Sequence, residues 1–184
     1  MTDPAKQQKL KIKELLIQLR SGEESTISKA LKGLQIHGEA KIIHPILDVW
    51  VEGLSDKNEK EVLEFLSSLK DSYAAEPIME AIHSNKYKTI RQPLLNTIWN
   101  TKVDFSEYLV DFVQIATQGD FMDALECLTI IENLEGPFLE EDLLEAQVYL
   151  SEYAENRKST DDTKAKLISE MAIQLKDLEQ NLEG

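Results

Sequence analysis

The histidines and carboxylates of this chain offer one pair with a spacing that suggests chemistry, Glu80 and His83. A Glu-x-x-His spacing places a carboxylate and an imidazole on one face of a helix, and helical bundles use two such pairs with further carboxylates to hold a di-metal centre. The sequence has no second Glu-x-x-His, and the other histidines, His37 and His44, belong to no similar pair. We therefore expect no metal and no cofactor, and interpret His83 as an exposed or interface side chain.

The motifs of nucleophilic catalysis and phosphate binding are missing from the sequence. It contains no Gly-x-Ser-x-Gly, no Gly-x-Gly-x-x-Gly and no Gly-x-x-x-x-Gly-Lys-Ser/Thr. The single cysteine, Cys127, lies in DALECLTII, where we expect a small, half-buried helix residue with no activating base nearby. Among 34 acidic residues, neighbours such as Glu140 and Glu141 carry no specific meaning. The sequence predicts a protein that is not an enzyme.

Charge and composition limit the classes of partner that this protein is expected to bind. With 34 acidic and 20 basic residues the formal charge is −14, which argues against nucleic acid because phosphate binding needs clustered Lys and Arg. Residues 1–20 carry five bases and two acids, whereas residues 135–184 carry thirteen acids and five bases. This asymmetry indicates either solvated helix faces or an acidic surface that steers a basic partner. One cysteine, no secretory leader and no run of about 18 apolar residues lead us to expect a cytoplasmic protein without a membrane span.

The apolar residues recur at intervals of three and four almost throughout, and glycine and proline are scarce, so the sequence predicts an all-α protein. The expected helices cover residues 5–20, 24–37, 39–53, 58–70, 73–84, 88–100, 105–117, 120–134, 138–156 and 161–182.

A short apolar motif repeats along the chain. Two adjacent apolar residues are followed by a third, three positions after the second, and the copies lie 32, 32 and 30 residues apart. The four copies are Ala30, Leu31 and Leu34; Val62, Leu63 and Leu66; Leu94, Leu95 and Ile98; and Ala124, Leu125 and Leu128. Another expected helix precedes each later copy, and Pro45 and Pro77 hold equivalent positions in two of these. The repeating unit is therefore an antiparallel pair, an A helix followed by a B helix.

These features resemble the HEAT-repeat and armadillo-like α-solenoid family. In that family the A helix often carries a kinking proline, and the B helix opens with an apolar residue followed by Arg, as Ile90 and Arg91 do in IRQPLLNTI. Asn85 stands where the family usually has Asp, and the segments SKALKGL and KEVLEFL lack the Arg, so an Asp-to-Arg ladder cannot run the length of the chain. The resemblance covers about residues 10–135 and implies a right-handed superhelix of about four helix pairs.

The prolines and the C-terminal segment refine this picture. A proline costs little stability in the first turn of a helix, but deeper inside a helix it causes a bend. Pro45, six residues after Glu39, therefore predicts a bend.

After Gly136 and Pro137 the repeat stops, so we expect repeats over 1–135 and a capping helix pair over 136–184 within one compact domain. The last helix spaces its apolar residues by three and four, which fits either a cap or a short seam for a weak homodimer: Ile168, Met171, Leu175, Leu178 and Leu182.

The surface of the B helices is where we expect function. In a two-helix solenoid the B helices line the concave side. The residues one and two positions after the second residue of each motif copy, and the residue after its third, form columns on that side. The candidate partner-binding residues are Lys32, Glu64, Phe65, Asn96, Trp99 and Glu126. Phe65 and Trp99 would be apolar anchors, because aromatic side chains carry much of the energy of protein interfaces, and Glu64 and Glu126 would steer the partner.

We thus expect a non-catalytic scaffold that binds a protein or peptide, possibly a basic one, as a monomer or weak homodimer. The alternative is an enzyme or metal-binding helical-repeat protein that acts on a small molecule in the groove, with Glu80 and His83 as its polar pair.

Overall fold

The computed structural model describes residues 4–37, 40–156 and 163–182 of the 184-residue chain, and within these ranges every regular element is a helix. The all-α prediction is confirmed. The ten α-helices are α1 (Pro4–Leu19), α2 (Glu24–His37), α3 (Ile43–Glu52), α4 (Asp56–Ser67), α5 (Ala75–His83), α6 (Arg91–Ile98), α7 (Leu109–Gln118), α8 (Phe121–Glu132), α9 (Glu140–Asn156) and α10 (Thr163–Leu182). None of the helices in the described ranges is long and apolar enough to cross a membrane.

Each expected helix corresponds to one of these α-helices, and the largest differences in their bounds lie at their first turns. Four of the segments open with a 3₁₀ helix that passes directly into the α-helix: η1 (Ala40–Ile42), η2 (Ser72–Ala74), η3 (Asn85–Ile90) and η4 (Ser106–Tyr108). The predicted start of the third helix, residue 39, lies outside the described residues. Periodicity shows that a segment is helical but does not show where the tighter 3₁₀ turn gives way to the α-helix.

Pro45, expected deep inside a helix, lies in the first turn of its α-helix, so the reason for expecting a bend there is removed. Pro45 is the third residue of α3, as Pro77 is of α5 and Pro93 is of α6. In the first turn of an α-helix the backbone N–H groups have no intrahelical acceptor, so a proline there gives up no hydrogen bond. The 3₁₀ turn over 40–42 places the start of the α-helix at Ile43, which puts Pro45 in that permissive turn.

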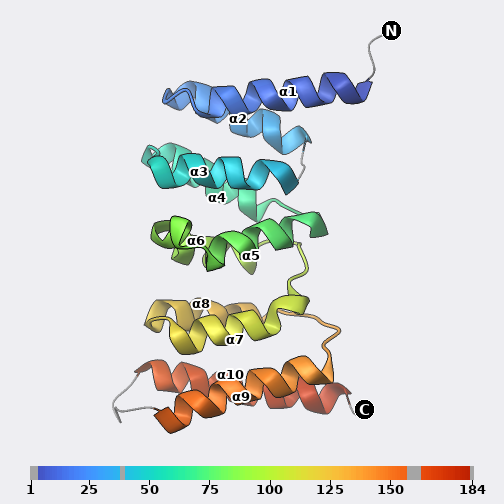
Figure 1. Ribbon diagram of the computed structural model, residues 1–184, viewed down its shortest axis with the longest axis vertical. Coiled ribbons are helices and arrows are strands. Elements are labelled where there is room, and N and C mark those ends of the chain that lie inside the picture. The colour runs from blue at the N-terminus through green and yellow to red at the C-terminus, as the bar shows by residue number, and fades with distance from the viewer. Residues whose placement is uncertain (1–3, 38–39, 157–162, 183–184) are drawn as a thin grey trace. The chain divides into compact units, whose positions relative to one another are not determined.

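The helices form two compact units, residues 1–103 and 104–184. In the first unit α1 packs on α2 and on α3, α3 on α5, and α2 and α6 both on α4. Figure 1 shows the pairs α1–α2, α3–α4 and α5–α6 following one another from blue to green. The A helices of the predicted repeat therefore contact A helices, and the B helices contact B helices.

The second unit repeats this arrangement with two pairs. α7 packs on α8 and α9, and α10 packs on α8 and α9. The contacts group α7 and α8 with the last two helices. The expected division after residue 135 into repeats and a capping pair stays a prediction. Ile168, Met171 and Leu175 of α10 are buried, so the apolar stripe of the last helix packs within this unit.

The repeated apolar motif forms the core. Ala30, Leu34, Val62, Leu66, Leu94 and Leu95 are fully buried, and so is Ala124 in the second unit. Cys127, expected to be half-buried, is fully buried. Because these side chains are small or medium in size, neighbouring helix pairs approach closely. The stacked pairs bury apolar surface that a single pair would leave exposed to water.

A polar contact also links α2 to α4. Asn58 is buried, and its side-chain amide donates to the backbone oxygen of Glu24 at 3.2 Å, to Ser28 Oγ at 3.1 Å and to Glu61 Oε2 at 2.9 Å. Ser28 Oγ also donates to Glu61 Oε2, at 2.6 Å. Burial raises the pKa of Glu61, but the hydrogen bonds from Ser28 and Asn58 outweigh it and hold the pKa below its ordinary value.

Candidate functional site

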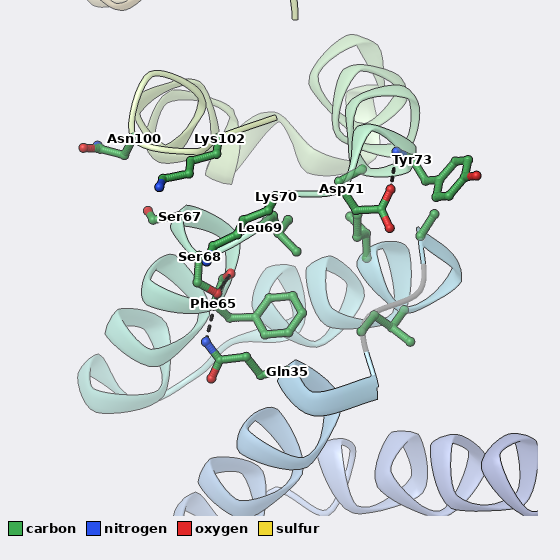
Figure 2. A pocket seen from close by; sticks show the side chains of 14 residues that line it. Gln35, Phe65, Ser67, Ser68, Leu69, Lys70, Asp71, Tyr73, Asn100 and Lys102 are labelled. Atoms are coloured by element: carbon green, nitrogen blue, oxygen red, sulfur yellow. Dashed lines mark hydrogen bonds between the residues drawn. The ribbon is translucent and has the colours of Figure 1, made fainter. Parts of the chain in front are cut away.

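The first unit contains a pocket of about 510 Å³ at the C-terminal ends of its B helices. It lies among the ends of α2 and α4, the start of α3 and the segments that follow α4 and α6 (Figure 2). Pockets of this size hold drug-sized molecules or a few side chains of a peptide, and their apolar walls provide most of the binding energy.

The pocket has an apolar floor and a polar rim. Figure 2 shows the ring of Phe65 between Gln35 on one side and Lys102 on the other. The apolar lining residues are Ala40, Ile42, Ile43, Phe65, Leu69 and Ala74. The remaining lining residues are Gln35, Ser67, Ser68, Lys70, Asp71, Tyr73, Asn100 and Lys102.

Hydrogen bonds fix the rim in place. Gln35 Nε2 donates to Ser68 Oγ at 2.9 Å, and Ser68 Oγ donates to the backbone oxygen of Phe65 at 2.7 Å. The backbone N–H of Lys102 donates to the oxygen of Leu69 at 3.2 Å, which ties the segment after α6 to the segment after α4. The pocket is therefore held by contacts between successive helix pairs.

Three of the predicted partner-binding residues lie together. Lys32, Glu64 and Phe65 line a smaller pocket of about 100 Å³ between α2 and α4. Lys32 and Glu64 are exposed, and Asn96 on α6 is half-buried. Lys32 and Glu64, which were expected in one column, do share a surface, and their role in binding stays a prediction.

The other three candidates differ in exposure. Phe65 is 3% exposed, Glu126 is 7% exposed and Trp99 is 41% exposed. Phe65 and Glu126 therefore lack the open surface that an anchor reaching into a partner, or a steering charge, would need. Phe65 forms part of the apolar floor of the pocket. Glu126 lies on α8, in the second unit.

Sequence reasoning missed the residues of the rim, although the repeat contained the signal. Pairs of lining residues stand 32 positions apart in the sequence: Gln35 and Ser67, Ile42 and Ala74, Ser68 and Asn100, and Lys70 and Lys102. Equivalent positions of successive helix pairs lie next to each other in a stack. The same 32-residue step that identified the B helices thus also indicates that the segments following these helices are neighbours.

Glu80, a member of the candidate metal pair, contacts a histidine of the preceding A helix. Its Oε2 lies 2.9 Å from Nε2 of His44, and the rings of His44 and Tyr87 stack at 6.0 Å. Within the described residues, no group of three or more His, Cys, Asp or Glu side chains could hold a metal ion.

Asp48 on α3 is the centre of a neighbouring charge network. It accepts hydrogen bonds from Lys86 Nζ and, at 2.6 Å, from the hydroxyl of Tyr87, and Arg20 lies 3.7 Å away. Burial raises the pKa of Asp48, but the hydrogen bonds from Lys86 and Tyr87 and the nearby positive charges outweigh it and hold the pKa below its ordinary value. Burial and the bond to Asp48 raise the pKa of the Tyr87 hydroxyl.

We predict that replacing Asp48 with Asn lowers the free energy of unfolding, by an amount that depends on pH. A carboxylate whose pKa is depressed by folding stabilises the fold above its unfolded-state pKa, about 3.8, and this contribution is lost as the pH falls through the lower folded-state value. Near neutral pH, Asp48→Asn should therefore reduce the free energy of unfolding by about 1–2 kcal/mol. The difference from wild type should shrink below about pH 3.8.

Urea unfolding at a series of pH values measures this difference. Tyr87→Phe, which removes one donor, should give a smaller loss, and Asp177→Asn on the exposed side of α10 should give none. A difference for Asp48→Asn that stays constant through the acid range would contradict the assigned role.

Comparisons of this chain with protein-family models, with curated proteins and with solved structures find no match. The established description is that of an all-helical protein with ten α-helices in its described residues, whose pairs pack in sequence order within each unit.

Proposed function

We propose that this protein is a non-catalytic α-solenoid scaffold that binds a segment of a partner protein in the pocket of its first unit. The packing of A helices on A helices and of B helices on B helices within each unit supports a HEAT-like stack of helix pairs, which we propose to be a right-handed superhelix. The single observation that carries the binding role is the pocket of about 510 Å³, with its apolar floor and polar rim.

The floor would take up one apolar side chain of the partner. Ile42, Phe65 and Ala74 are almost wholly buried, so the surrounding side chains hold them in place. A methyl-rich or aromatic side chain would therefore contact a preformed apolar surface. Little ordering of the protein is needed, because hydrogen bonds between the helix pairs already hold the rim.

The rim would fix the orientation of the bound segment. Lys70 and Lys102 can donate to carbonyl or carboxylate oxygens, and Asp71 and Asn100 offer acceptors to its N–H groups. Trp99 directly precedes Asn100 in sequence and is 41% exposed, which suits the flank of an interface. Over longer distances the charge of −14 favours a basic partner.

Selection of peptides from a random display library tests this proposal. The wild-type protein should enrich peptides that share an apolar or aromatic position. Ser67→Trp, which places an indole into the pocket from the last residue of α4, should weaken their binding at least tenfold, about 1.4 kcal/mol.

Gln118→Trp is the matched control, because Gln118 is the exposed last residue of α7 and lies in the other unit. It should bind the selected peptides like wild type. The proposal fails if no peptide is enriched, or if the enriched peptides bind Ser67→Trp and wild type equally.

A further inference from the structure

The outward side of the first helix pair carries exposed apolar residues between lysines. Leu10 and Ile17 of α1 are 54% and 65% exposed, and Ile36 of α2 is 81% exposed. In α1, Leu10 and Ile17 alternate with Lys6 and Lys13 at steps of four, three and four residues. This spacing places these four side chains on the side of the helix opposite its buried residues. We call this surface the head face, and its members are Lys6, Leu10, Lys13, Ile17, Lys29 and Ile36.

The outward side of the last helix pair carries a similar row with the opposite charge. Leu144 and Val148 of α9 are 51% and 55% exposed, and Ile173 of α10 is 51% exposed. Acidic residues share the α9 row at steps of three and four, and all of them are exposed. We call this surface the tail face, and its members are Glu141, Leu144, Val148, Glu152, Glu155 and Ile173.

The two faces are complementary in charge. α1 contains four lysines and one glutamate, whereas α9 contains six acidic residues and no Lys or Arg. A lysine row against a glutamate row favours pairing of the two faces, and each face would repel a second copy of itself. Apolar side chains in both rows would be removed from water by the same contact.

We propose that the head face of one copy of this chain docks on the tail face of a second copy. Inside each unit, A helices pack on A helices and B helices on B helices, as α7 does on α9 and α8 on α10. Docking α1 and α2 of one copy on α9 and α10 of the next would continue that packing across the junction. The contact is heterologous, so it repeats from copy to copy and builds rings or linear chains.

The ionic strength decides how strong this contact is. The charge of −14 on each copy repels other copies over long distances, whereas the paired rows act at close range, within the Debye length of about 8 Å at physiological salt. Association should therefore be seen at physiological ionic strength and should weaken at about 1 M salt, where the Debye length is about 3 Å.

Sedimentation velocity of the full chain over a wide concentration range tests the proposal. The wild-type protein should form dimers or larger species as its concentration rises. A double variant with an acidic head, Lys6→Glu with Lys13→Glu, and one with a basic tail, Glu141→Lys with Glu152→Lys, should each associate at least about tenfold more weakly.

Mixing the two double variants is the decisive measurement. Each alone has two faces of like charge, but together every head meets a tail of opposite charge, so the equimolar mixture should recover association. Two controls make the same charge changes at exposed residues outside both faces and should behave like wild type: Lys60→Glu with Lys88→Glu, and Glu107→Lys with Glu132→Lys.

Circular dichroism is used to check whether each variant keeps its helices. Should a charge variant lose its helices, Leu10→Gln and Val148→Gln test the same faces through their apolar residues, and each should weaken association. The proposal is overturned if the wild type stays monomeric or if the mixed double variants do not recover association.

Discussion

Replacing Phe65 with alanine is expected to lower the free energy of unfolding by about 3–5 kcal/mol. Phe65 is 3% exposed, and its ring fills the space between α2, α4 and the start of α3, so its removal leaves a cavity joined to the pocket. Urea unfolding followed by circular dichroism measures the loss. A change below about 1 kcal/mol would contradict the buried position of the ring.

Trp99→Ala is the informative comparison, because Trp99 is 41% exposed at the end of α6. It should change stability far less than Phe65→Ala and should act mainly on binding. Phe65→Leu keeps most of the volume and should cost less than about 1.5 kcal/mol, so it allows the pocket to be altered without unfolding the unit. Peptides selected on the wild type should discriminate against Phe65→Leu if the ring is part of their binding surface.

Asn58→Ala should lower the free energy of unfolding by about 2–3 kcal/mol. The buried amide donates to Glu24, Ser28 and Glu61, and its loss removes these three hydrogen bonds from the contact between α2 and α4, where Ser28 Oγ still donates to Glu61. Hydrogen exchange of the amides in α2 and α4 measures where the structure opens, and the increase should be largest in these two helices.

Asn100→Ala is the control for Asn58→Ala. Asn100 is exposed, and its side chain donates to the backbone oxygen of Asn96 at 3.2 Å, so its removal should change stability by less than about 0.5 kcal/mol. Equal losses for the two variants would show that the contact between α2 and α4 has no special weight.

The location of the helices could be predicted from the sequence. The spacing of the apolar residues depends on the backbone geometry of each helix alone, and α2 begins and ends where that spacing predicted. The first turns could not be predicted in this way. Whether Ala40–Ile42 is a 3₁₀ turn or the start of an α-helix depends on what the segment packs against, and this is why Pro45 was expected deeper in its helix than it lies.

The candidate site was predictable in part. Lys32, Glu64 and Phe65 do line a common surface, because the repeat step fixes which residues of successive B helices are neighbours. The depth of each side chain in the stack is a different matter. Phe65 and Trp99 were both expected to be anchors on the same face, yet Phe65, which precedes the last residue of its motif copy, is buried, and Trp99, which follows the last residue of its copy, is exposed.

Periodicities within and between neighbouring segments were enough to predict an all-helical protein, the pairing of its helices and the apolar face of each helix. The tertiary structure alone decided how far the rim residues close around the pocket, that Glu80 contacts His44, that Asp48 gathers Arg20, Lys86 and Tyr87, and that the contacts divide the chain after Val103. These outcomes depend on distances between side chains far apart in the sequence, and such distances are set by the packing of whole helices rather than by any local pattern.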